Sequence, residues 1–239
     1  MITVASTIKP PMWCPGRNGH PLWRGCVGYW PLWASAGTKA MDLSGNSNNG
    51  TIGASLTWLQ TTQGIGVSCA AGGGINCGAG TALDSVVNEV SLEYVFVVTG
   101  TGSSYGRLSD KHPGPTIALS DGSRTVYFYG TIGGEARSLV LVTSAISLNV
   151  LYHLVVTYKN DSVHAMHTYL NGTLVATNTD ASGAIATTTV PLYIGDRQAG
   201  SRPFLGSILL HAEHNIQLSP GAIAELAADP FCMIRPIAG

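Results

Sequence analysis

The chain has 239 residues, of which 10% are charged, and its formal net charge is −1. A hydrophobic content of 45% with so little charge excludes the composition of a disordered chain. Because there is no basic excess to release counterions from phosphates, the composition also argues against DNA or RNA binding. A single large all-β domain commonly has this length.

The cysteine content indicates mostly reduced thiols. Five cysteines are present, an odd number, and no Cys-x-x-Cys suggests a zinc ribbon. Cys69 could pair with Cys77, and Cys14 with Cys26, but buried free cysteine is the state that we expect.

Residues 1–24 are predicted to form an irregular arm, because proline and glycine pairs follow one another closely there. Trp13 and Trp23 give the arm apolar anchors, and such rings rarely stay in water. The arm therefore lies across its own domain or against a neighbouring subunit, and we favour the neighbouring subunit. A basic region followed by an apolar core is missing from the N-terminus, so we expect no signal peptide.

The strand pattern begins after the arm. Residues 25–33 are predicted to be the first strand, residues 51–59 a second, and residues 61–80 a glycine-rich series of turns. A clear strand follows at 88–99, with three short ones at 116–119, 125–131 and 138–142. A strand about every ten residues is typical of a β-sandwich.

The most distinct pattern covers residues 151–178 and predicts a three-strand antiparallel meander. Both faces of residues 151–158 are largely apolar, which indicates a strand that is covered on both sides. The Asn171-Gly172 pair predicts a type I′ hairpin turn before the last strand. The region 138–158 carries no formal charge, but its seven polar residues and its alternation argue against a membrane-spanning helix.

One helix is predicted near the C-terminus. Ser219 suits the N-cap position and Pro220 the first helical position, while Asp229-Pro230 ends the helix. The tail 231–239 then carries apolar side chains that need cover, which the N-terminal arm could supply.

Several ordered motifs resemble the laminin G-like, concanavalin A-like jelly-roll domains. They are Tyr152–Tyr158 with Tyr169–Gly172, then Pro191–Gly195 and Phe204–Ile208, and upstream Val27–Trp30 and Asp42–Thr51. The resemblance implies an all-β antiparallel jelly-roll β-sandwich over residues 25–230, between the arm 1–24 and the tail 231–239. The family usually has a tryptophan at the position of Tyr152.

The loop 42–49 is a candidate Ca²⁺ site. It offers one carboxylate and several amide and hydroxyl oxygens, of which Asp42 and Asn46 are the candidate ligands. Resembling domains often bind Ca²⁺ through the corresponding aspartate, although the acid that the family has in a C-terminal strand is replaced by Leu209 here. The alternative is a cluster of Asx turns that closes the loop with its own hydrogen bonds.

Catalytic patterns are missing. The Glu-x-Asp-x-Glu strand of resembling glucanases does not occur, nor does Gly-x-Ser-x-Gly, and Glu89 and Glu93 are four residues apart. The pairs His164/His167 and His211/His214 have odd spacing, which in a strand places the rings on opposite faces. We therefore predict no enzyme and no catalytic residue.

Function is predicted in order of preference. The first hypothesis is a structural or adhesion module of a phage virion, made in the host cytoplasm, that assembles as a homo-oligomer or with other virion proteins. The alternative is an extracellular lectin-like module that binds a glycan, ahead of a glycan-active enzyme. The aromatic residues expected for a lectin, Tyr105, Tyr127, Tyr129 and Trp58, are scattered along the sequence. The residues predicted to contact another subunit are Trp13, Trp23, Phe231, Met233 and Ile234.

Overall fold

The computed structural model describes residues 19–69, 72–100, 105–120, 122–143 and 146–235, which form two facing antiparallel sheets. We call them sheet A and sheet B. Sheet A contains β1 (Cys26–Trp30), β4 (Thr57–Thr61), β5 (Gly64–Ser68), β7 (Glu89–Val98), β12 (Leu151–Lys159), β13 (Met166–Leu170), β14 (Thr173–Asn178) and β16 (Gly206–His214). Sheet B contains β2 (Lys39–Ala40), β3 (Gly50–Thr51), β6 (Ile75–Asn76), β8 (Gly106–Asp110), β9 (Thr116–Leu119), β10 (Val126–Ile132), β11 (Glu135–Val142) and β15 (Tyr193–Ile194).

The helical segments are few and short. They are the 3₁₀ turns η1 (Pro21–Trp23), η2 (Thr81–Asp84) and η3 (Cys232–Ile234), and the α-helix α1 (Pro220–Ala228). As predicted, α1 begins at Pro220, and the hydroxyl of the N-cap Ser219 accepts a hydrogen bond from the Ala222 amide. Among the described residues, no helix is long and apolar enough to cross a membrane.

The predicted jelly-roll β-sandwich and its central meander are confirmed. Sheet A follows the order β14-β13-β12-β7-β16-β5-β4, with β1 paired to β16, so that β12, β13 and β14 are antiparallel neighbours. Asn171 has φ 51° and Gly172 φ 79°, which are the two positive values that a type I′ turn requires. The predicted strands at 88–99, 116–119, 125–131 and 138–142 correspond to β7, β9, β10 and β11.

Two predictions of local structure were wrong. The predicted strand 51–59 is divided between β3 in sheet B and β4 in sheet A. The break falls near Gly53, where any Cβ atom would collide with the backbone oxygen of Gly73. Within the predicted glycine-rich turns, Gly64–Ser68 forms the strand β5, which pairs with β4 and β16.

The main core lies between the two sheets, and a histidine is enclosed in it. The His211 ring stacks between Trp30, at 5.5 Å, and Tyr94, at 4.6 Å between ring centroids. Its Nε2 lies 3.1 Å from Glu213 Oε1, and both side chains are fully buried. His214 lies on the other face of the same strand, with Nε2 3.1 Å from the Leu22 carbonyl oxygen, as the odd spacing predicted.

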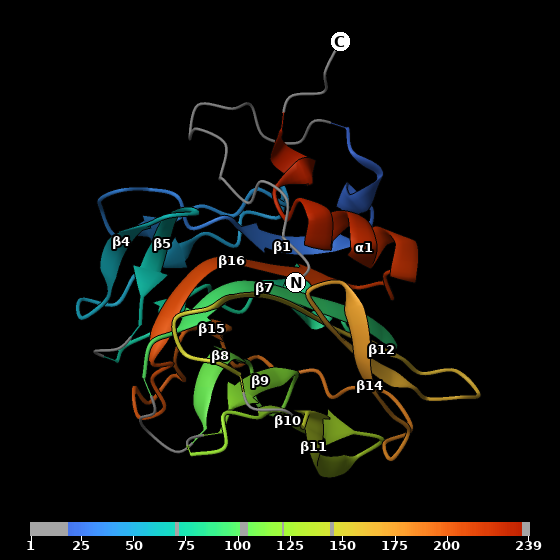
Figure 1. Cartoon of the computed structure of the whole chain (residues 1–239). Helices are drawn as coiled ribbons and strands as arrows, with labels where there is room; N and C mark the ends of the chain where they lie inside the picture. The colour runs from blue at the N-terminus through green and yellow to red at the C-terminus, as the bar shows by residue number, and fades with distance from the viewer. Residues whose placement is uncertain (1–18, 70–71, 101–104, 121, 144–145, 236–239) are drawn as a thin grey trace.

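A second core covers the outer face of sheet A. Figure 1 shows α1 and β1 on one side of β7, β12 and β16, with β8 to β11 on the other side. We call η1, α1 and η3 together the cap. The Trp23 indole donates a hydrogen bond to the Met233 carbonyl (3.0 Å), which joins the two ends of the described chain. Within the described residues, Trp23 of the predicted arm therefore packs with the tail residues Phe231, Met233 and Ile234.

The cap changes the interpretation of the predicted interface residues. Trp23 is 6% exposed, and Phe231, Met233 and Ile234 are fully buried against sheet A of their own chain. These four side chains therefore offer little surface to another subunit in this conformation, and their role in assembly stays a prediction. Trp13 lies outside the described residues. Cys69 and Cys77 are buried free cysteines, as expected.

Candidate functional site

Three tyrosines gather on the outer face of sheet B, and we call them the tyrosine cluster: Tyr105, Tyr127 and Tyr129. Strand β10 alternates, so that Val126, Phe128 and Ile132 enter the core and the two tyrosines between them face outward. Tyr105, which immediately precedes β8, meets both rings edge-on, with centroids 5.5 Å from Tyr127 and 5.7 Å from Tyr129. The rings of Tyr127 and Tyr129 are nearly parallel, with 17° between their planes.

Arg107 and Asp110, at the two ends of β8, hold the cluster in place. The guanidinium carbon of Arg107 lies 4.9 Å from the centroid of the Tyr129 ring, within the range of a cation–π contact. Arg107 Nε donates to Asp110 Oδ2 (2.9 Å), and its Nη1 donates to the Tyr105 carbonyl (3.2 Å). Both side chains are about nine-tenths buried, which makes the pair more rigid than an exposed ion pair.

The backbone of Tyr105 has an unusual conformation. Its φ is 60°, a left-handed value that costs a bulky residue free energy and that recurs at ligand sites. The strained position brings the ring to the cluster, where it stays 37% exposed. Burial raises the pKa of the Tyr129 hydroxyl, against the opposing effect of its hydrogen bond with Ser138, so the phenol is neutral at pH 7.

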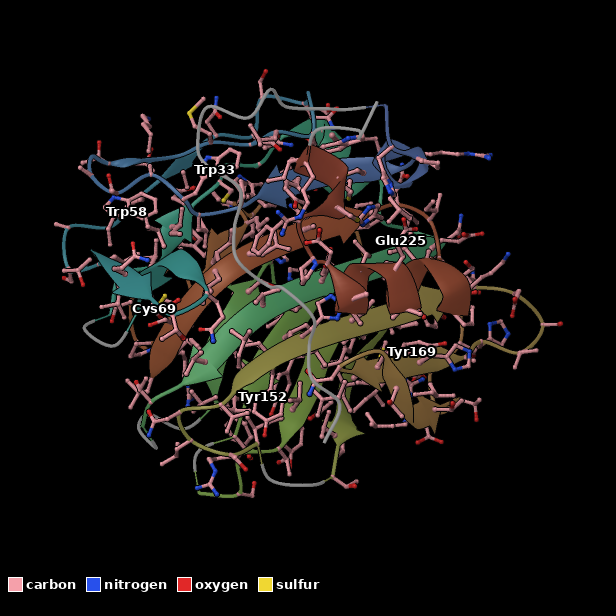
Figure 2. The ribbon with its side chains drawn as sticks, turned by 45° about the horizontal axis from the view of Figure 1, so that its top comes forward. Trp33, Trp58, Cys69, Tyr152, Tyr169 and Glu225 are labelled. Atoms are coloured by element: carbon pink, nitrogen blue, oxygen red, sulfur yellow. The ribbon has the colours of Figure 1, made fainter. Side chains whose placement is uncertain are left out.

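This arrangement can bind a molecule that has both apolar and hydroxyl faces. Aromatic faces carry a negative quadrupole that attracts polarised C–H groups, and phenol hydroxyls both donate and accept hydrogen bonds. Of the four aromatic residues that look scattered in the sequence, three therefore meet. Trp58 lies apart from them on β4 of sheet A, where its indole donates to the Gly37 carbonyl (2.9 Å; Figure 2).

The predicted Ca²⁺ residues lie together in one loop, but Asp42 is already engaged there. Asp42 Oδ1 accepts hydrogen bonds from the amides of Tyr29 and Ser44, and Oδ2 accepts from the Ser44 hydroxyl and the Asn48 amide. The side-chain nitrogen of Asn46 donates to the Ser44 hydroxyl (3.1 Å). These contacts match the alternative of a loop closed by its own hydrogen bonds. Ca²⁺ binding would have to replace some of them and stays a prediction.

The two carboxylates considered for catalysis, Glu89 and Glu93, lie in different surroundings and contact different partners. Glu89 accepts from the Gln217 amide and lies 3.2 Å from Lys159 Nζ at the surface. Glu93 is fully buried beneath the cap, with Oε1 2.9 Å from His153 Nε2. The two acids therefore do not share a cleft that a substrate could enter.

The two antiparallel sheets form a jelly-roll β-sandwich, with the tyrosine cluster on the outer face of sheet B. The chain belongs to the concanavalin A-like lectin/glucanases superfamily, whose family model matches residues 70–224. No curated protein matches the chain in sequence.

Solved structures share the fold at low sequence identity. The binding domain of Paraclostridial Mosquitocidal Protein 1 is 14% identical, with a TM-score of 0.66 over 85% of this chain and 52% of that one. Domain 4 of AbnA, an extracellular arabinanase from Geobacillus stearothermophilus solved with arabinotriose, is 18% identical, with a TM-score of 0.63 over 84% and 98%. Trypanosoma rangeli sialidase with sialic acid is 15% identical, with a TM-score of 0.61 over 85% and 33%. The chain thus spans about half of the first of these structures and a third of the sialidase.

Proposed function

We propose that this chain is a non-catalytic carbohydrate-binding module that binds glycans on the outer face of sheet B. The tyrosine cluster, braced by Arg107 and Asp110, is the observation that carries the proposal. It combines aromatic faces, phenol hydroxyls and one fixed ion pair on a rigid sheet, which are the elements of a small-molecule site.

The chemistry of the cluster suits a sugar ring. The C–H groups on one face of a sugar can rest against the rings of Tyr127 and Tyr129, while Tyr105 borders them edge-on. The hydroxyls at the rim of the sugar can exchange hydrogen bonds with the phenols and with the Arg107–Asp110 pair. Both interactions need little movement, because the residues stand on β8 and β10 or next to them.

The relatives support binding more than catalysis. The family takes its name from lectins and glucanases, and the arabinanase domain that matches this chain along almost its whole length was solved with arabinotriose. The described residues place no pair of carboxylates beside the tyrosine cluster that would suit glycosidic cleavage. With this function we propose an extracellular location for the protein.

The hypothesis of a phage virion component, as a capsid decoration or tail-associated protein, is the second candidate. It rests on the low charge, the tryptophan-bearing arm and the apolar tail. Trp23, Phe231, Met233 and Ile234 are buried within their own chain, so these side chains already pack against the cap and sheet A. Glycan binding is therefore the function that we put first.

A glycan array with matched variants tests the proposal. Wild-type protein is expected to bind a restricted group of glycans. Tyr127→Ala and Tyr129→Ala each remove one ring face and are expected to lose roughly tenfold or more in affinity, which corresponds to about 1.4 kcal/mol or more. Tyr127→Phe keeps the ring and is expected to retain most of the affinity. Leu59→Ala changes an exposed side chain on β4 of sheet A, far from the tyrosine cluster, and serves as the control.

A further inference from the structure

Three side chains that differ in chemistry meet at the edge of the cap. His20 is the N-cap of η1, Glu225 lies within α1, and Cys232 begins η3. One ligand atom from each, the His20 nitrogen, the Glu225 carboxylate oxygen and the Cys232 sulfur, lies within 4.8 Å of the others. His20 Nε2 is 3.0 Å from Glu225 Oε1, and Figure 2 shows Glu225 on α1 above sheet A.

The donor atoms and their spacing suit a transition metal of intermediate softness. Zn²⁺ binds thiolate, imidazole and carboxylate at about 2.0–2.3 Å, so neighbouring ligand atoms in a tetrahedral site are about 3.3–3.8 Å apart. Small side-chain movements bring the three atoms from their present spacing to that geometry. The Glu225 side chain is 52% exposed, so an ion can enter from solvent and a water molecule can complete the coordination.

The electrostatic surroundings also favour a cation. Three carboxylates, those of Glu93, Glu225 and Asp229, act electrostatically on the Cys232 sulfur. Of these acids, Asp229 is paired with Arg235, and Glu93 lies buried with its second oxygen, Oε2, lacking a hydrogen-bond partner in the described part of the chain. A divalent ion would supply the positive charge that a thiolate needs in this acidic setting.

We propose that His20, Glu225 and Cys232 form a Zn²⁺ site that fastens η1 to α1 and η3. On binding, the Cys232 thiol releases its proton to solvent and the thiolate coordinates the ion. His20 coordinates through Nε2 with its proton on Nδ1, which gives up the long 3.3 Å hydrogen bond from the Leu22 amide. The site joins segments some 200 residues apart in sequence and lies on the opposite side of sheet A from the tyrosine cluster, so it does not depend on glycan binding.

Cobalt substitution tests the assignment of the ligands. Titration of metal-free full-length protein with Co²⁺ is expected to give a thiolate-to-cobalt charge-transfer band in the near ultraviolet. The band is expected to disappear in Cys232→Ser and to persist in Cys26→Ser, a buried thiol outside the set. Absence of the band in wild type, its survival in Cys232→Ser, or its loss in Cys26→Ser would overturn the proposal.

Thermal melting provides the second readout. A hundredfold excess of free Zn²⁺ over its dissociation constant is expected to raise the melting temperature by roughly 5–10 °C, and a chelator to reverse the rise. His20→Asn removes the coordinating Nε2 but keeps a side chain that can cap η1, and Glu225→Gln keeps the size of the side chain. Both variants are expected to fold without metal and to lose most of the shift. An unchanged shift in both would contradict the site.

Discussion

At the scale of single residues, Asp42 organises its loop through four accepted hydrogen bonds. Asp42→Ala leaves the buried donors of Tyr29, Ser44 and Asn48 without this acceptor, so we expect a loss of about 2–4 kcal/mol in the free energy of unfolding. Urea denaturation measures this. Asp42→Asn, which keeps one oxygen acceptor, is expected to lose less, and an unchanged midpoint for Asp42→Ala would contradict the role.

The calcium hypothesis is tested on the same loop. If Asp42 and Asn46 bind Ca²⁺, a hundredfold excess of the ion over its dissociation constant adds about 2.7 kcal/mol to stability. Melting of wild type and Asp42→Ala with Ca²⁺ and with chelator measures this. A shift in the melting temperature of wild type that Asp42→Ala abolishes would support Ca²⁺ binding by the loop. Identical melting curves in Ca²⁺ and in chelator would contradict it.

His214 makes stability depend on pH. Burial lowers its pKa below the ordinary 6.5, although Glu93, the Leu22 carbonyl and Glu213 favour the charged ring. The unfolded chain therefore takes up a proton near pH 6.5 that the folded chain does not, and stability falls as the pH drops below that value. His214→Gln can still donate to Leu22 and is expected to reduce the loss of melting temperature between about pH 7.5 and pH 5.5. The partly exposed His167→Gln is the control, and equal slopes for wild type and His214→Gln would contradict the assignment.

At the scale of elements, the turn between β13 and β14 is constrained on two sides. Gly172 has φ 79°, and a Cβ atom there would lie 2.8 Å from the Ala227 Cβ on α1. Gly172→Ala is therefore expected to cost about 1–3 kcal/mol. Gly122→Ala, where no atom lies within 4 Å of the added Cβ, is expected to stay within about 0.5 kcal/mol. Similar melting temperatures for the two variants would mean that the turn accepts the side chain.

The sequence predicts those elements whose pattern lies within a few neighbouring residues. Alternation and the Asn171-Gly172 turn suffice for the meander, and Ser219-Pro220 for the start of α1. Strand β5, with Gly64 and Gly66 in five residues, lacks that pattern and gains its order by pairing with β4 and β16. Such pairing depends on distant segments, which a local pattern does not contain.

The sites depend even more on distance. Tyr127 and Tyr129 are a local pair, but Tyr105 reaches them because β8 and β9 bring it across sheet B. His20 and Glu225 are 205 residues apart, so their contact follows only from the folded cap. In this chain, patterns within strands predict which face a side chain occupies, but not which other strand supplies its neighbour.

At the scale of the whole molecule, the cap stabilises sheet A through Trp23. Its ring meets Tyr29 edge-on at 5.2 Å, and its indole binds the Met233 carbonyl. Trp23→Ala is expected to cost about 3–5 kcal/mol in denaturant unfolding, whereas the exposed Leu174→Ala stays within about 0.5 kcal/mol. Light scattering on the same variants distinguishes the alternative. Dissociation of an oligomer by Trp23→Ala without loss of stability would favour the role in assembly.

NMR mapping tests most directly whether glycans bind on the outer face of sheet B. Isotope-labelled protein is titrated with the glycan that wild type binds best on the array, and chemical-shift changes are followed residue by residue. The largest changes are expected on Tyr105, Arg107, Tyr127 and Tyr129, and Tyr127→Ala is expected to need roughly tenfold or more glycan to reach the same changes. Binding that shifts another surface, such as β4 or the Asp42 loop, and leaves these four residues unchanged would contradict the proposed site, as would the failure of every glycan on the array to bind.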